Sequence, residues 1–129
     1  MIVIDLSAII AIAANEFMAL GCQKVLEAEK IVLISAGTLA EVLIVAARRK
    51  LVPGVSELLT NVITQTIDVT PARAHMAAIA YARWGKGFHP ASLNFGDCFA
   101  YATAQEFDCP LLFVGNDFSR TDIKPAITA

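Results

Sequence analysis

Four acidic residues in this sequence could act together on one ligand: Asp5, Glu41, Asp97 and Asp117. Asp5 stands inside an apolar run, where a lone carboxylate is costly to bury unless its charge is paired or neutralised. Carboxylates that converge repel one another, and a hard divalent cation such as Mg²⁺ or Mn²⁺ offsets that repulsion through oxygen ligands. If the four acids meet, they predict a metal site suited to phosphodiester hydrolysis, in which the cation activates a water molecule.

Strands that alternate with helices are expected to position these acids. Apolar runs predict strands over 1–4, 31–34, 66–69 and 110–114. Helices are expected from about residue 8 after a Ser7 cap, from a Ser35 or Thr38 cap to about residue 50, and over 17–29, 55–64, 71–84 and 94–106. This alternation predicts an α/β domain with a mostly parallel sheet. Ligand sites in such sheets gather beyond the carboxyl ends of the strands, where all four acids are expected.

The composition favours one compact domain over residues 1–129. Of the 129 residues, 57% are apolar and 17% are charged, which argues against disorder. The formal net charge of −2 gives no general basic field for nucleic acid, although it leaves a local acidic cleft open. The cysteines are Cys22, Cys98 and Cys109, with no CxxC pair, so zinc and disulfide frameworks are not expected.

Targeting and membrane segments are not expected either. The apolar start lacks the basic residues of a signal peptide, and Asp5 interrupts it. The sequence has no run of about 20 uninterrupted apolar residues for a membrane span. Together with three free thiols, which suit a reducing compartment, these features predict a cytoplasmic protein without a membrane partner.

Each acid also has a purely structural explanation. Asp5 could cap the helix that follows it, and in isolation this explanation is as good as a ligand role. Glu41 follows Thr38 by three residues, the spacing of a capping box, and this is the better explanation for Glu41 alone. Asp97 could complement a helix dipole, and Asp117 could form a turn. The shared position of all four at one edge favours the site.

Four segments have a familiar form: IVIDLSA over 2–8, SAGTLAE over 35–41, GKGFHPASLNFGDCFAY over 85–101 and LLFVGNDF over 111–118. In these segments, and over nearly its whole length, the chain resembles the PIN-domain ribonucleases, specifically the VapC-type toxins of toxin–antitoxin pairs. The segment before and around Asp97 is the most specific match. The resemblance departs at Leu6, where Thr or Ser is usual, and at Asn116, where many relatives have an acid.

The resemblance implies a PIN-like three-layer α/β/α sandwich in which the four acids are catalytic and bind Mg²⁺ or Mn²⁺, with Asp5 and Asp97 as metal ligands. It further implies an endoribonuclease toxin that cleaves RNA, forms a homodimer and is covered by the tail of a small VapB-like antitoxin. A non-catalytic PIN-like module that binds RNA or protein is the alternative, motivated by Leu6 and Asn116. A phosphate-accepting receiver domain ranks far below, because no acid stands in the required mid-chain position.

Other side chains could serve the same crevice. Basic residues that could hold RNA phosphates are Arg83, Lys86 and Arg120, although solvated surface charge explains each equally well. His89 is expected to shape its loop rather than to contact substrate, and His75 to be an ordinary packing or surface residue. The aromatic residues expected in the core or in a dimer contact are Trp84, Phe95, Phe99 and Tyr101.

Overall fold

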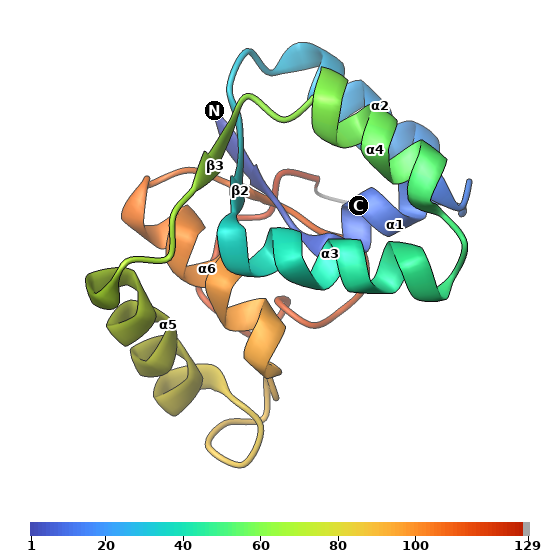
Figure 1. Ribbon diagram of the computed structural model, residues 1–129. Coiled ribbons are helices and arrows are strands. Elements are labelled where there is room, and N and C mark those ends of the chain that lie inside the picture. Colours follow the sequence, from blue (N-terminus) through green and yellow to red (C-terminus); the bar gives the residue numbers. More distant parts are fainter. Residues whose placement is uncertain (128–129) are drawn as a thin grey trace.

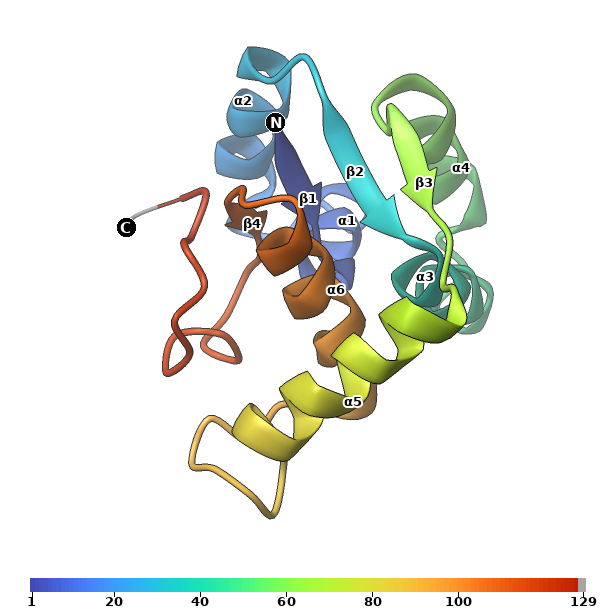
Figure 2. The same ribbon diagram turned by 90° about the vertical axis from the view of Figure 1, so that its left-hand side faces the viewer.

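The computed structural model describes residues 1–127, in which four strands alternate with six helices (Figure 1). The strands are β1 (Ile2–Ile4), β2 (Val32–Ser35), β3 (Gln65–Ile67) and β4 (Leu111–Leu112). The helices are α1 (Leu6–Ala13), α2 (Ala19–Ala28), α3 (Ala36–Arg48), α4 (Val52–Asn61), α5 (Pro71–Trp84) and α6 (Phe95–Glu106). The sheet order is β3-β2-β1-β4, and every pairing is parallel (Figure 2). The expected parallel sheet is therefore confirmed.

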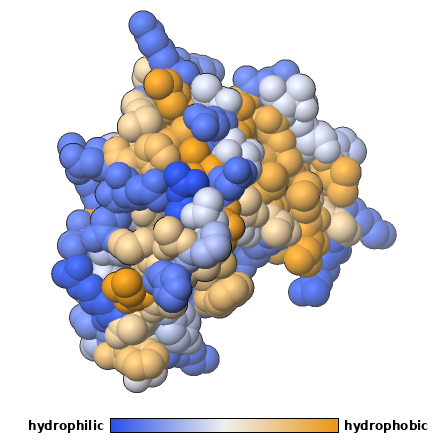
Figure 3. All heavy atoms as spheres, turned by 60° about the vertical axis from the view of Figure 1, so that its left-hand side comes forward, coloured by the Kyte–Doolittle hydropathy of each residue, from blue (hydrophilic) through white to orange (hydrophobic). Residues whose placement is uncertain are grey.

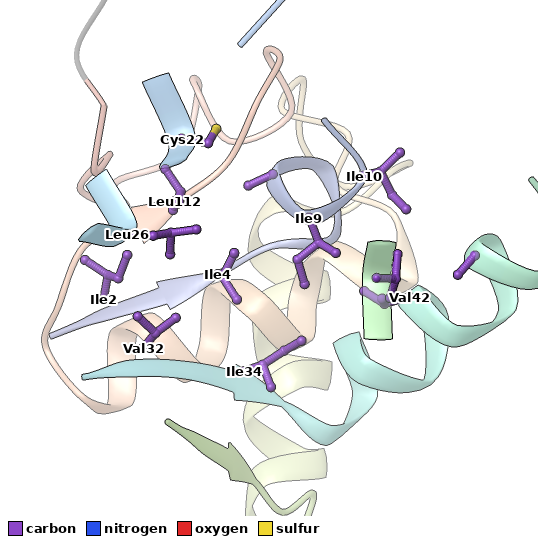
Figure 4. Close-up of a cluster of buried hydrophobic side chains, with 13 residues drawn as sticks. Ile2, Ile4, Ile9, Ile10, Cys22, Leu26, Val32, Ile34, Val42 and Leu112 are labelled. Atoms are coloured by element: carbon purple, nitrogen blue, oxygen red, sulfur yellow. The ribbon is translucent and has the colours of Figure 1, made fainter. Parts of the chain in front are cut away.

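The helices cover both faces of the sheet, because successive residues of a strand point to opposite faces. Ile2 and Ile4 of β1 pack with buried residues of α1, α2, α3 and α4 (Figure 4). Val3 points the other way and packs with buried residues of α5 and α6. Two cores on either side of one sheet make the three-layer α/β/α sandwich, and the prediction of that fold is confirmed.

The first helix begins earlier than expected. The sequence predicts a start at about residue 8 with Ser7 as the cap, whereas α1 begins at Leu6 and its cap is Asp5. The Asp5 side chain accepts a hydrogen bond from the Ser7 backbone N–H, which is the usual role of an aspartate at a helix start. The structural explanation of Asp5 is therefore correct, and it does not conflict with a role as a ligand.

Most other elements also begin or end a few residues from the expected positions, and three of them show a clear difference. Helix α4 begins at Val52 rather than at residue 55, because Pro53 fits the first turn of a helix, where its missing N–H is not needed. Strand β3 ends at Ile67, two residues early. Strand β4 ends at Leu112, because the N–H of Val114 donates to the Ser7 hydroxyl instead of to a strand. Helix α5 spans Pro71–Trp84, as predicted.

Apolar side chains also reach the surface. Phe95 at the start of α6 is 74% exposed, so it is not a core residue, and a dimer contact remains a prediction for it. Figure 3 shows one face on which orange, hydrophobic residues lie among blue, hydrophilic ones. Such patches can mark contacts with a partner. Within residues 1–127, none of the helices is both long and apolar enough to cross a membrane.

Candidate active site

Asp5 lies directly beyond the carboxyl end of β1 and is buried, with 5% of its surface exposed. Its Oδ2 accepts hydrogen bonds from the backbone N–H of Ser7 at 3.1 Å and from the Ser7 hydroxyl at 2.6 Å. Burial raises the pKa of Asp5, and the hydrogen bonds from Ser7 oppose that rise. Local donors thus stabilise the charged form of Asp5, which forms no ion pair with any residue that the structure describes.

Glu41 lies in the second turn of α3, and the predicted capping box with Thr38 is wrong. Helix α3 is capped by Ser35, whose side chain accepts a hydrogen bond from the N–H of Gly37 at 3.2 Å. Thr38 therefore falls inside the helix, and its buried hydroxyl has no hydrogen-bond partner within residues 1–127. Ser35 already provides the cap, so the Glu41 side chain is available for a contact elsewhere.

That contact is with the start of α6. A Cβ atom added to Gly96 would clash with both carboxylate oxygens of Glu41, so the Glu41 carboxylate rests against the Gly96 backbone. Burial raises the pKa of Glu41, and the charge of Asp5 raises it further. The absence of a side chain at Gly96 thus brings an acid of α3 beside the first turn of the helix that carries Asp97.

Asp97 completes a capping box at the start of α6. Its Oδ2 accepts a hydrogen bond from the N–H of Asn94 at 3.0 Å, and Asn94 Oδ1 accepts one from the N–H of Asp97 at 2.8 Å. The pKa of Asp97 is raised to about 7, mainly by burial and further by the charges of Asp5, Asp117 and Glu41, while the hydrogen bond from the Asn94 N–H opposes the rise. The charge of each of the three other acids therefore affects the pKa of Asp97.

Asp117 lies in the exposed turn that follows β4. Its charge raises the pKa of Asp5 as well as that of Asp97. The N–H of Val114, three residues before Asp117, donates to the Ser7 hydroxyl, which in turn donates to Asp5. The turn begins at Gly115, whose φ of +99° is a conformation that a side chain disfavours. Asn116, which stands between Gly115 and Asp117, is exposed.

The four predicted acids therefore form one electrostatically coupled cluster beyond the carboxyl ends of β1 and β4. Within residues 1–127, none of the four takes part in an ion pair. In the same residues, no three His, Cys, Asp or Glu side chains are arranged to hold a metal ion as they stand. The carboxylates of Asp5 and Asp97 are instead turned toward the helix starts that they cap.

The donor chemistry fits a hard divalent cation. The cluster offers carboxylate oxygens, which Mg²⁺ and Mn²⁺ prefer, and no basic side chain of residues 1–127 pairs with them. Burial raises the pKa values of Asp5, Glu41 and Asp97, and repulsion from neighbouring acids raises them further. A cation among the acids would remove that repulsion. Closing the oxygens around a cation requires rotation of these side chains.

Two neighbouring residues matter that sequence reasoning did not single out. Gly96 makes room for the Glu41 carboxylate, and the signal for it was a glycine directly before Asp97 in a helix start. The sequence predicts only a capping role for Ser7, whereas its hydroxyl donates to Asp5 and accepts from the N–H of Val114 at 2.9 Å. The partner at Val114 is 107 residues away in sequence, and no local pattern indicates it.

The basic residues predicted to contact phosphates differ in whether an acid already pairs with them. Arg83 lies 3.5 Å from Asp122 in an ion pair. Lys86 and Arg120 are exposed and take part in no ion pair within residues 1–127. His89 accepts a hydrogen bond from the N–H of Ala91 at 2.9 Å, which agrees with a role in shaping its loop.

Solved structures similar to this chain have the same fold. VapC20 of Mycobacterium tuberculosis matches with a TM-score of 0.75 and 18% sequence identity, over 95% of this chain and 96% of that one. The VapBC2 structure from Rickettsia felis matches with a TM-score of 0.72 and 12% identity, over 97% of this chain and 96% of that one. At these identities the likeness concerns the fold.

Sequence comparison is more specific. The PIN domain family matches residues 2–124. A VapC ribonuclease of Mycobacterium bovis is 40% identical over 124 residues, which are 94% of this chain and 95% of that protein. Ribonuclease VapC42 of Mycobacterium tuberculosis is 39% identical over 131 residues, covering 98% of this chain and 99% of that protein. On the family match and these identities over nearly the whole length, the chain belongs to the VapC ribonuclease family of PIN-domain proteins.

Proposed function

We propose that this chain is the ribonuclease toxin of a type II toxin–antitoxin pair, and that it hydrolyses RNA phosphodiester bonds with Mg²⁺ or Mn²⁺ bound among its four acids. The observation that carries the proposal is the cluster of Asp5, Glu41, Asp97 and Asp117, which has no basic partner in residues 1–127. Burial raises the pKa values of Asp5, Glu41 and Asp97, and charges of neighbouring acids in the cluster raise them further. The names of its relatives support the reaction: those at about 40% identity are VapC ribonucleases.

The proposed roles follow from burial and contacts. Asp5 and Asp97 are the buried acids, and they are the proposed ligands of the cation. When bound, the cation would supply Lewis acidity toward the phosphodiester and its attacking water. Glu41, whose pKa is raised by burial, is suited to accept a proton from that water. Asp117, on its exposed turn, adds negative charge at the mouth of the site.

RNA contacts are proposed for Lys86 and Arg120 first. Both side chains are exposed and free of ion pairs within residues 1–127, so a phosphate would not have to displace a carboxylate. Arg83 is a weaker candidate, because its guanidinium is paired with Asp122 and lies 4.6 Å from the centre of the Trp84 ring.

The metal-dependent reaction can be tested on purified protein. Native protein should cleave RNA in the presence of Mg²⁺ or Mn²⁺, and EDTA should stop the cleavage. Asp5→Asn, Glu41→Gln and Asp97→Asn should each abolish cleavage while cooperative unfolding is retained. Asp68→Asn, which changes an exposed aspartate of the loop after β3, is the matched control and should keep full activity. Full activity of Asp97→Asn would contradict the proposed site.

A VapB-like antitoxin and a second copy of the chain are the proposed partners. The similar structures include a toxin–antitoxin complex from Klebsiella pneumoniae and VapBC2 of Rickettsia felis bound to a promoter DNA fragment. An arginine from an antitoxin would complement the uncompensated carboxylates by bidentate hydrogen bonding. Expression of the chain alone should arrest growth, and co-expression with the antitoxin should relieve the arrest. A chain that binds RNA but cleaves none would instead support the non-catalytic alternative motivated by Leu6 and Asn116.

A further inference from the structure

Four side chains form a closed ring beside the α5–α6 side of the sheet. The indole N–H of Trp84 donates to the Tyr101 hydroxyl at 2.9 Å, and the Tyr101 hydroxyl donates to Asp122. Asp122 pairs with Arg83 at 3.5 Å, and the Arg83 guanidinium lies 4.6 Å from the centre of the Trp84 ring. The ring thus joins the end of α5, the middle of α6 and the segment after β4.

The hydroxyl of Tyr101 has a fixed role in this ring. An indole N–H can only donate and an ionised carboxylate can only accept, so the hydroxyl must accept from Trp84 and donate to Asp122. Tyr101 is 1% exposed, so water cannot readily take the place of either partner. A phenylalanine would fill the same space and lose both hydrogen bonds.

The position of Tyr101 links it to the acidic cluster. It follows Asp97 by four residues on α6, so the two lie on the same face of that helix. Asp122 follows Asp117 by five residues in the segment after β4. The hydrogen bond between Tyr101 and Asp122 therefore connects the helix that carries Asp97 to the segment that carries Asp117.

The segment 113–122 is fixed at its other end as well. The N–H of Val114 donates to the Ser7 hydroxyl, which in turn donates to Asp5. Between these two anchors, Phe118 is buried and packs 5.1 Å from the ring of Phe113. Asp117 itself is exposed, so its placement depends on the anchors around it.

We propose that Tyr101 is a positioning residue, which holds segment 113–122 through Asp122 and thereby fixes Asp117 relative to Asp97. The inference rests on the proposed function, because it assigns Tyr101 a role in the site where the cation would bind. The rival explanation is that burial of Phe118 alone holds the segment and that the hydrogen bond to Asp122 is dispensable.

The test compares Tyr101→Phe with Tyr81→Phe. Tyr81 is half-buried on α5, and its hydroxyl makes no hydrogen bond within residues 1–127, so it is a matched control. Backbone hydrogen exchange in segment 113–122 should become about tenfold faster in Tyr101→Phe, the factor expected for one lost hydrogen bond, and should not change in Tyr81→Phe. Unchanged exchange in Tyr101→Phe would overturn the proposal in favour of Phe118.

Direct Mn²⁺ binding, followed by electron paramagnetic resonance without RNA, tests the link to the acidic cluster. Tyr101→Phe should weaken Mn²⁺ binding, and the weakening should largely disappear in an Asp117→Asn background, since the two changes then act through one residue. Equal weakening in both backgrounds would overturn the link to Asp117. Native protein that bound no Mn²⁺ and cleaved no RNA would refute the proposed function, and the exchange rates would still decide whether Tyr101 holds the segment.

Discussion

Replacing Asp97 with asparagine should change how the stability of the metal-free protein depends on pH. Burial and three neighbouring acids raise the pKa of Asp97 from 3.8 to about 7. A carboxyl whose pKa is higher in the folded state than in the unfolded state favours folding at low pH, and that contribution is lost as the pH rises toward the folded-state pKa. The native protein should therefore lose more stability between pH 5 and pH 8 than Asp97→Asn.

The size of the difference follows from the two pKa values. With 3.8 in the unfolded state and about 7 in the folded state, proton linkage predicts a loss of about 2 to 3 kcal/mol in the free energy of unfolding between pH 5 and pH 8. Most of the loss falls below pH 7, because above the folded-state pKa both states are largely ionised. Asparagine does not titrate, and its side-chain oxygen can still accept the hydrogen bond from the Asn94 N–H.

Urea unfolding in EDTA at several pH values between 5 and 8 measures this difference. Asp5 and Glu41, whose pKa values burial also raises, contribute a slope that both proteins share. Asp68→Asn, at an exposed site, should follow the native curve and serves as the control. Parallel curves for native protein and Asp97→Asn would show that Asp97 has an ordinary pKa and would refute the coupling of the acids.

Three further changes test single contacts in the site. Gly96→Ala places a methyl group against the Glu41 carboxylate, so Mn²⁺-dependent RNA cleavage should fall at least about tenfold. The Tm should not change, since the flexible end of the Glu41 side chain can move away. Unchanged cleavage would contradict the contact. Ser7→Ala removes a donor to Asp5 and should lower the free energy of unfolding by about 1–3 kcal/mol in urea titrations, whereas no loss would show the hydroxyl to be dispensable. Asn116→Asp should tighten Mn²⁺ binding in calorimetric titrations, but modestly, because each added charge also increases repulsion in the metal-free protein; an unchanged affinity would mean that Asn116 points away from the site.

The sequence by itself determined the order of the elements and the edge where the acids gather. Alternating apolar runs and helical stretches predicted the parallel sheet, and the bounds of α5 matched because Pro71 marks its first turn. Parallel strands with helical crossovers bring their carboxyl ends to one side, so Asp5 and Asp117 could be placed together before any contact was known. These features depend on patterns within a few residues, and such local patterns can be recognised in the amino-acid sequence.

Contacts between distant segments were decided only by the tertiary structure. A capping box from Thr38 to Glu41 had the correct spacing, yet Ser35 caps the helix and Glu41 rests against Gly96. Asp122 stands only five residues after Asp117, yet its carboxylate contacts Tyr101 and Arg83. The pKa of Asp97 likewise depends on three acids from other segments. Burial and charge coupling arise when packing brings distant segments together. The spacing of residues along the chain does not predict which distant segments will meet.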